Sequence, residues 1–173
     1  MEEKTLSEEI IYQGKILKLK KIQVQLNNGL KSTREIVEHN GAVAIIVCEN
    51  NKFLFVKQYR KAFEEILLEI PAGKLEIGEI PLECARRELE EETGYIADTL
   101  ELIQIIYPSP GFCTEKIYLF KASDLRLGKI NFDEDENIIS EWIEKDKLVE
   151  MIGEGKIKDA KSLLGVVLYT PFL

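Results

Sequence analysis

The chain has 173 residues, a mass of 19.8 kDa and a net charge of -8. This length can bury the core of one domain with a small appendage, and a mixture of 45% hydrophobic and 31% charged residues is typical of a folded protein. The acidic balance argues against binding to duplex nucleic acid, because neutralising phosphates requires a basic face. An anionic small ligand is compatible with this charge if metal ions bridge the two.

The cysteines and histidine do not suggest a zinc site or a disulfide framework. Cys48, Cys84 and Cys113 are odd in number and widely spaced, and His39 is the only histidine. We expect free thiols and a structural or surface role for His39. The N-terminus lacks a basic segment followed by an apolar one, and no later run is long enough to span a bilayer. The expectation is a cytoplasmic protein with no membrane partner.

The first 40 residues predict an antiparallel β lobe. Apolar and polar residues alternate on both sides of Asn27-Asn28-Gly29, a triplet that tolerates the positive φ of a hairpin turn. Residues 41–173 then form the main domain. Its first part predicts two buried strands around the turn at residues 49–51, and a third strand that ends near Pro71 and Gly73.

The pattern changes to a helical period at Pro81. Leu82, Ala85 and Leu89 recur at helical spacing, Pro81 suits a first turn, and Gly94 suits the position just past the end. Strands are predicted within 99–111 and 115–122 and at 138–143, and helices at 146–155 and 159–170. The order predicts a mixed sheet with one helix inserted midway and others at the end.

The helix that begins at Pro81 gathers negative charge on one side. Glu88, Glu91 and Glu92 fall within about 100° of arc, given about 100° of rotation per residue. Like charges at these spacings destabilise a helix, so local stability gives no reason for them. Carboxylate oxygens of this kind suit hard cations such as Mg²⁺ or Mn²⁺, which bridge to phosphates.

A simpler interpretation is that the acidic side is only a solvated surface. Arg86 with Glu90, or Arg87 with Glu91, would then form exposed ion pairs of small energy. For the helix alone this alternative is favoured. The preceding stretch PAGKLEIGE changes the balance, because its proline and two glycines predict a tight loop that delivers backbone groups to the helix start.

Loop and helix together resemble the Nudix box. The stretch GKLEIGEIPLECARRELEEETGY, residues 73–95, fills every fixed position of that motif, with Tyr95 less apolar than the usual last residue. The resemblance implies a site for divalent cations and hydrolysis of a nucleoside diphosphate linked to another moiety. It makes Glu88, Glu91, Glu92 and the carbonyl of Ala72 metal-ligand candidates. It gives structural roles to Gly73, Glu79, Arg87 and Gly94, with Arg87 tied to Glu79.

The resemblance extends to the ADP-ribose pyrophosphatase branch of that family. The stretches REIVEHNGAVAII, VKQYR and LLEIPAG resemble its upstream segments, and Pro110 lies fifteen residues beyond Tyr95. This implies that Arg34 and Arg60 bind the substrate phosphates or ribose and that Glu115 contacts the distal ribose. The alternative for Arg34 and Arg60 is that they are surface arginines on strands.

DEDENIISEWI resembles an acidic loop of the same branch. Matched position by position, Glu134 would help to activate water and Glu136 would contact metal. A solvated acidic loop is the alternative, and the general base stays open between Glu134 and a box glutamate such as Glu91 or Glu92.

The predicted fold is therefore an α/β (α+β) Nudix fold, a mixed sheet sandwiched between helices with an N-terminal antiparallel lobe. The predicted reaction is Mg²⁺- or Mn²⁺-dependent hydrolysis of ADP-ribose to AMP and ribose 5-phosphate. The resemblance also implies a homodimer through residues 1–40. Three alternatives stay open: another nucleoside diphosphate sugar or dinucleotide as substrate, a non-catalytic ADP-ribose-binding module, and an acidic scaffold without a ligand.

Overall fold

The structure is a computed structural model that describes residues 2–128 and 138–169. The chain divides into two compact units. Unit 1 is the N-terminal segment up to Gly41 together with Tyr107–Lys116, and unit 2 comprises the remaining residues. That Tyr107–Lys116 belongs with the first 40 residues was not predicted from the sequence. Within the described ranges, no helix is both long and apolar enough to cross a membrane.

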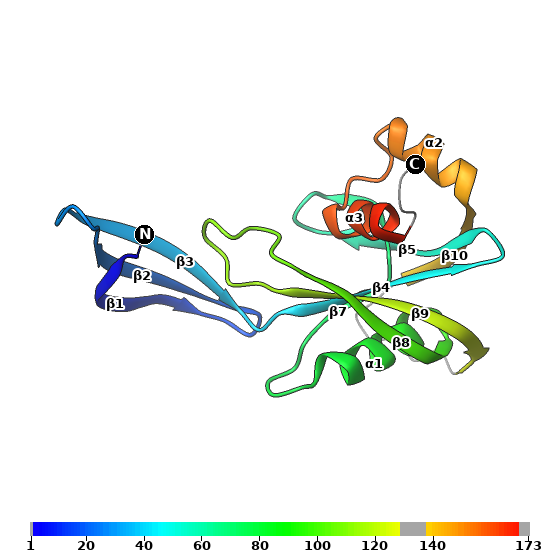
Figure 1. Ribbon diagram of the computed structural model, residues 1–173, viewed down its shortest axis with the longest axis horizontal. Coiled ribbons are helices and arrows are strands. Elements are labelled where there is room, and N and C mark those ends of the chain that lie inside the picture. Colours follow the sequence, from blue (N-terminus) through cyan, green and yellow to red (C-terminus); the bar gives the residue numbers. More distant parts are fainter. Residues whose placement is uncertain (1, 129–137, 170–173) are drawn as a thin grey trace. The chain divides into compact units, whose positions relative to one another are not determined.

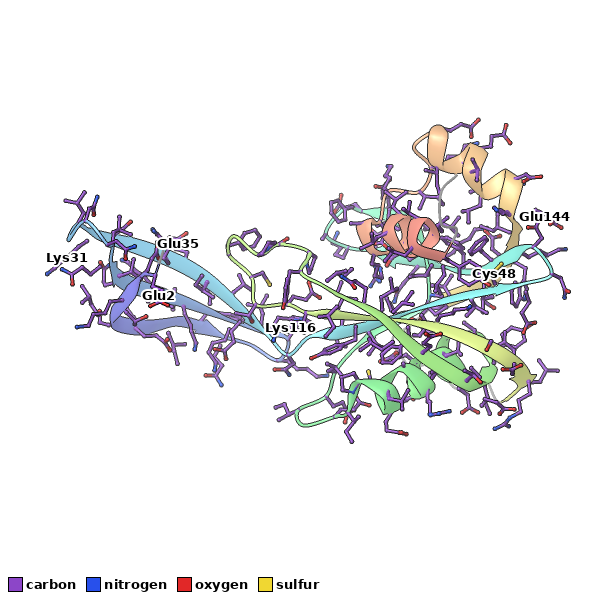
Figure 2. All side chains as sticks on the ribbon, viewed as in Figure 1. Glu2, Lys31, Glu35, Cys48, Lys116 and Glu144 are labelled. Carbon is purple, nitrogen blue, oxygen red and sulfur yellow. The ribbon has the colours of Figure 1, made fainter. Side chains whose placement is uncertain are left out.

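Unit 1 is a three-stranded antiparallel sheet in the order β1-β2-β3, with β1 at Lys4–Gln13, β2 at Leu17–Gln25 and β3 at Lys31–His39 (Figure 1). The predicted turn is confirmed: the Leu26 amide donates to the Leu30 carbonyl at 2.8 Å, and Gly29 has a φ of 84°. Side chains project from the three strands throughout the sheet (Figure 2). The segment Tyr107–Lys116 joins β3, because Val37 donates to the Phe112 carbonyl at 2.7 Å and accepts from the Thr114 amide at 2.9 Å.

Unit 2 is built on a mixed sheet in the order β10-β5-β4-β9-β8. β4 and β9 are parallel, whereas the other neighbours are antiparallel. β5 pairs with β4 only near their turn and then with β6, while β7 pairs with the start of β4. The strands are β4 (Ala42–Glu49), β5 (Lys52–Arg60), β6 (Glu65–Glu69), β7 (Ala72–Lys74), β8 (Tyr95–Ile106), β9 (Ile117–Leu127) and β10 (Ile138–Glu144).

Helices cover both faces of this sheet. α1 (Pro81–Thr93) lies on one face, and α2 (Lys145–Gly153) and α3 (Ala160–Tyr169) lie on the other (Figure 1). β4 is buried on both sides, since its alternate residues enter two separate hydrophobic clusters, as expected for a central strand. The predicted sandwich of a mixed sheet between helices, and each predicted helix, is confirmed.

The ends of α1 follow the signals in the sequence. Pro81 occupies the first turn, where its missing N–H would have no helical partner, and Ile80 supplies no side-chain cap. At the other end Gly94 has a φ of 73° and its amide donates to the Glu90 carbonyl at 2.8 Å. This left-handed position suits glycine, which has no Cβ to clash with the following carbonyl. The helix therefore ends at a defined residue directly after its acidic side.

A buried ion cluster attaches α3 to the sheet. Glu69, only 2% exposed, accepts hydrogen bonds from Arg60 Nε at 2.7 Å and Nη2 at 2.8 Å, and it forms an ion pair with Lys161 of α3. Burial alone would raise the pKa of Glu69, but the hydrogen bonds from Arg60 and the charge of Lys161 outweigh it and hold this pKa at about 2. The carboxylate therefore stays ionised in the folded protein.

Glu69 makes folding pH-dependent in a defined direction. Its pKa is lower in the folded protein than the ordinary value of 4.5, so its stabilising contribution is complete above pH 4.5 and is lost as the pH falls towards 2. In that window we expect the free energy of unfolding to fall more steeply with decreasing pH for the wild type than for Glu69→Gln. Denaturant titrations at several pH values measure both slopes.

At neutral pH, Glu69→Gln should lower the free energy of unfolding by roughly 2 kcal/mol, because the half-exposed Arg60 loses its charged acceptor and the buried Lys161 keeps only Asp159 as a counter-charge. The matched control is Glu141→Gln, which breaks the exposed Lys57–Glu141 pair of 2.8 Å and should cost less than about 0.5 kcal/mol. Equal losses for the two variants, or parallel pH slopes for Glu69→Gln and wild type, would contradict the assignment.

Candidate active site

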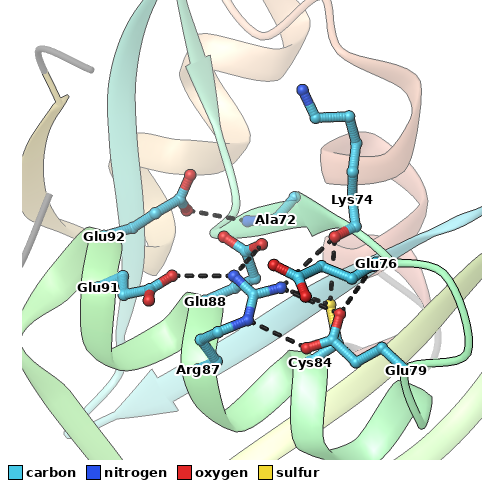
Figure 3. A network of polar contacts seen from close by, with 9 residues as sticks. All are labelled: Ala72, Lys74, Glu76, Glu79, Cys84, Arg87, Glu88, Glu91 and Glu92. Atoms are coloured by element: carbon cyan, nitrogen blue, oxygen red, sulfur yellow. Dashed lines mark hydrogen bonds and ion pairs between the residues drawn. The ribbon is translucent and has the colours of Figure 1, made fainter. Parts of the chain in front are cut away.

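Arg87 is the centre of the acidic side of α1 (Figure 3). Its Nε donates to Glu79 Oε1 at 3.0 Å and its Nη2 to Glu79 Oε2 at 3.1 Å, which is the contact that the box resemblance implied. Its Nη1 donates to Glu88 Oε1 at 2.8 Å and to Glu91 Oε2 at 2.9 Å. One guanidinium thus binds three carboxylates, two from its own helix and one from the preceding loop.

These contacts shift the pKa values of Arg87 and of Glu79. The hydrogen bond to Glu79 is the main reason why the pKa of Arg87 rises further above its ordinary value, and Glu88 and Glu91 add to it. The same bond lowers the pKa of Glu79. Burial raises the pKa of the Cys84 thiol, which lies 3.4 Å from Arg87 Nη2, so Cys84 is a neutral thiol; the three cysteines are free, as expected.

Glu92 faces the loop rather than Arg87. Its side chain is on the buried side of α1, with 3% of the residue exposed, and its Oε2 accepts a hydrogen bond from the Ala72 amide at 3.0 Å. The Ala72 residue lies in β7, twenty positions earlier in the chain. A carboxylate from the last turn of α1 is therefore tied to the backbone of the segment that leads into the box loop.

Gly73 has a specific steric reason to be glycine. A Cβ built on Gly73 would lie 1.8 Å from Cδ of Glu88, far inside any real contact. The Glu88 carboxylate therefore occupies the space that a side chain at Gly73 would fill. Loop backbone and helix carboxylates approach this closely only because position 73 has no side chain.

The donor set fits a hard divalent cation. Carboxylates of Glu88, Glu91 and Glu92 come from adjacent turns of one helix face, and the Ala72 backbone lies against them, so every candidate ligand is an oxygen. Across residues 2–128 and 138–169, no three His, Cys, Asp or Glu side chains are already grouped as a metal site, and Glu88 and Glu91 are bonded to Arg87. The Arg87–Glu91 ion pair that the simpler interpretation predicted is present, and it belongs to the network that also includes Glu79 and Glu88.

The remaining predicted substrate residues belong to different units. Arg60 of unit 2 is held by Glu69, and its side chain remains 39% exposed, so a fixed arginine still reaches the surface. Arg34 of unit 1 donates from Nε to Glu3 at 3.0 Å and from Nη1 to Ser32 Oγ at 2.8 Å. Glu115, also in unit 1, lies with Oε1 3.8 Å from His39 Nδ1. Glu134 and Glu136 fall outside the described residues.

Several contacts around the site were not foreseen from the sequence. Lys161 and Ser162 lie 92 positions from Glu69 and Ile70, and only the tertiary structure brings them to these residues that precede the box. Glu69 lies in the stretch LLEIPAG that carries part of the resemblance, but no role was predicted for it. Tyr95, the unusual last residue of the box, receives the Trp142 indole N–H on its hydroxyl at 3.2 Å, which gives the polar atom at that position a partner.

Known proteins resemble this chain over nearly its full length. It is 45% identical over 168 residues to a methanol dehydrogenase activator from Bacillus methanolicus, which covers 95% of this chain and 91% of that protein. It is 43% identical to an ADP-ribose pyrophosphatase from Bacillus subtilis, covering 96% and 91%, and 34% identical to one from Mycobacterium tuberculosis, covering 94% and 81%.

The fold is also found among solved structures. A crystal structure described as an ADP compounds hydrolase superposes with a TM-score of 0.86 at 20% identity, covering 98% of this chain and 92% of that one. The family model of the NUDIX domain matches residues 38–164, which contain the whole of unit 2 up to the middle of α3. With the box geometry and this match, the chain belongs to the Nudix family.

Proposed function

We propose that this protein is a Nudix pyrophosphohydrolase that converts ADP-ribose and water to AMP and ribose 5-phosphate. The observation that carries the proposal is the complete set of box carboxylates, Glu88, Glu91 and Glu92, packed against a loop that only glycine at position 73 permits. Two relatives that align over nearly the whole chain are named ADP-ribose pyrophosphatase. An acidic scaffold without a ligand would have no need of this loop and helix arrangement.

The box residues would hold Mg²⁺ or Mn²⁺ through Glu88, Glu91, Glu92 and the Ala72 carbonyl. When bound, such an ion neutralises the pyrophosphate and lowers the pKa of an attacking water. The protein itself supplies orientation: Arg87 fixes α1 against the loop through Glu79, and Glu92 fixes the Ala72 backbone. In the reaction a water oxygen forms a bond to one phosphorus while the bridging P–O bond breaks, and the bridging oxygen leaves with the other phosphate.

Proton removal from the water requires a base near the pyrophosphate. We assign it to Glu134, with Glu136 as a further metal ligand, on the resemblance of residues 133–143 to the acidic loop of the branch. A box glutamate, Glu91 or Glu92, is the second candidate.

Substrate binding is proposed to use Arg34, Arg60 and Glu115. Arg60 is the best supported, because Glu69 holds its guanidinium in one orientation while part of the side chain stays exposed. A guanidinium fixed in this way can donate to a phosphate without losing much further side-chain entropy. A cytoplasmic location belongs to the same proposal, and three free thiols fit a reducing compartment.

A substrate panel tests this proposal. Product release is measured from ADP-ribose, ADP-glucose, GDP-mannose, a dinucleotide and a nucleoside triphosphate, each with Mg²⁺, with Mn²⁺ and with chelator. We expect metal-dependent AMP release that is fastest from ADP-ribose. Several relatives are named GDP-mannose pyrophosphatase. Faster turnover of GDP-mannose or of a dinucleotide would contradict ADP-ribose as the substrate but would leave the proposed metal site standing. Binding of ADP-ribose without turnover would favour a non-catalytic binding module.

Glu92→Gln should lower kcat by at least about 100-fold without unfolding the protein. The amide oxygen of glutamine can still accept the hydrogen bond from Ala72, but it lacks the negative charge that a cation requires. The matched control is Glu83→Gln, an exposed glutamate in the first turn of α1, which should keep activity within about twofold. Full activity of Glu92→Gln would contradict the assigned metal role.

A homodimer through unit 1 completes the proposal. β1 is an edge strand, and all ten of its residues are exposed. Four large hydrophobic residues on it are more than 40% exposed: Leu6, Ile10, Ile11 and Tyr12. An edge strand with this much exposed apolar surface favours pairing with another chain, and a second copy is always available. The sheet of one copy would then lie against that of the other.

Light scattering tests the dimer directly. We expect a mass near twice 19.8 kDa for the wild type and a shift towards the monomer for Ile10→Glu, because a charge replaces apolar contact area. Leu127→Glu is the control, since Leu127 is 82% exposed on β9 of unit 2 and should leave the dimer intact. A monomeric wild type at micromolar concentration would refute the proposed interface.

A further inference from the structure

The residues from Glu69 to Gly73 form the lead-in segment, which connects β6 to the box loop and is held at every position. Ion pairs bind Glu69, the Pro71 carbonyl accepts from the Ile45 amide at 2.8 Å, and the Ala72 amide donates to Glu92. Gly73 lies directly under the Glu88 carboxylate. The backbone of this segment therefore sets where the loop meets the carboxylates of α1.

Besides Glu69, α3 also holds Ile70 of this segment. Its amide donates to Ser162 Oγ at 2.8 Å, and both residues are completely buried. The side chain of Ile70 is also in close contact with α3, because a Cβ added at Gly165 would lie 3.1 Å from Ile70 Cδ1. Both the backbone and the side chain of Ile70 therefore contact α3.

Ser162 is itself held in place. Its hydroxyl donates to Asp159 Oδ2, and its amide donates to the same oxygen at 2.9 Å, which caps the first turn of α3. With its hydrogen given to Asp159, the Ser162 oxygen presents a lone pair to the Ile70 amide. The neighbouring Lys161 forms ion pairs with Glu69 and with Asp159 at 3.0 Å. Asp159, Lys161 and Ser162 therefore act on two adjacent residues of the lead-in segment.

We infer that Ser162 is a positioning residue for the box: it fixes Ile70, and through the rigid Ile70-Pro71-Ala72 backbone it fixes the Ala72 groups that meet Glu92. The inference rests on the proposed metal-binding function of the box glutamates. Removing the hydroxyl takes away the acceptor that the structure shows for the Ile70 amide, and a buried backbone N–H seldom finds water instead. Loss of this bond frees the lead-in segment at the residue two positions before Ala72.

The experiment compares Ser162→Ala with Leu163→Ala in the full-length protein. Leu163→Ala removes packing of the adjacent α3 residue against the same core but leaves the Ser162 hydroxyl in place. Three quantities are measured: hydrogen exchange of the Ile70 and Ala72 amides, Mn²⁺ affinity by electron paramagnetic resonance, and the metal dependence of ADP-ribose hydrolysis. Thermal unfolding reports how far each variant is destabilised.

For Ser162→Ala we expect faster exchange at both amides and Mn²⁺ affinity about tenfold weaker, as for other residues that orient metal ligands indirectly. Saturating metal should restore most of kcat with the KM for ADP-ribose unchanged. Leu163→Ala should leave exchange at Ala72 and the Mn²⁺ affinity at wild-type values. Equal losses in both variants, or wild-type affinity and exchange in Ser162→Ala, would overturn the inference.

Exchange and Mn²⁺ binding require no turnover, so the inference and the proposed function fail separately. If the wild type binds Mn²⁺ but does not hydrolyse ADP-ribose, only the proposed substrate is refuted. If the wild type does not bind Mn²⁺, the metal site on which the inference rests is refuted. If Ser162→Ala does not fold, Ser162→Cys serves instead, because it nearly keeps the volume and offers only a weak sulfur acceptor. Wild-type exchange and affinity in Ser162→Cys would then overturn the inference.

Discussion

The ion network around Arg87 is the constraint on which this site depends. Two helix carboxylates, Glu88 and Glu91, share Nη1 of one guanidinium, and Glu79 from the loop takes the other side. Without a counter-charge, glutamates at these spacings would repel one another and weaken α1. Arg87 supplies that charge and at the same time ties the loop to the helix. Under the proposed function, a bound cation would supply further neutralisation at the same carboxylates.

The strands of the sheet connect the site to the rest of unit 2. Where β5 leaves β4, the lead-in segment runs between the strands, with β6 paired to β5 and β7 paired to β4. α1 approaches it from one face and α3 from the other, so Glu92 and Ser162 bind amides only two residues apart. Proline at position 71 stiffens the intervening backbone. The Ala72 backbone, against which the carboxylates of α1 lie, is thus fixed by contacts from both layers of helices.

Local signals predicted much of this architecture. The hairpin at Asn27–Gly29 and the boundaries of α1 at Pro81 and Gly94 follow from residues close together in sequence, whereas the Arg87–Glu79 contact was implied by the resemblance to the Nudix box. The Glu69–Lys161 and Ile70–Ser162 contacts join residues 92 positions apart, and no periodicity encodes such a pairing. The need for glycine at position 73 was visible only as part of a motif, and its cause is the Glu88 carboxylate in three dimensions.

The most direct test of this account is anomalous scattering from crystals grown with Mn²⁺. The account predicts a manganese peak within about 2.5 Å of carboxylate oxygens from at least two of Glu88, Glu91 and Glu92. It also predicts that Arg87 keeps its bond to Glu79, because that contact holds the loop whether or not metal is present. Absence of a peak beside α1 in crystals of an active preparation, or a peak bound only by other residues, would contradict it.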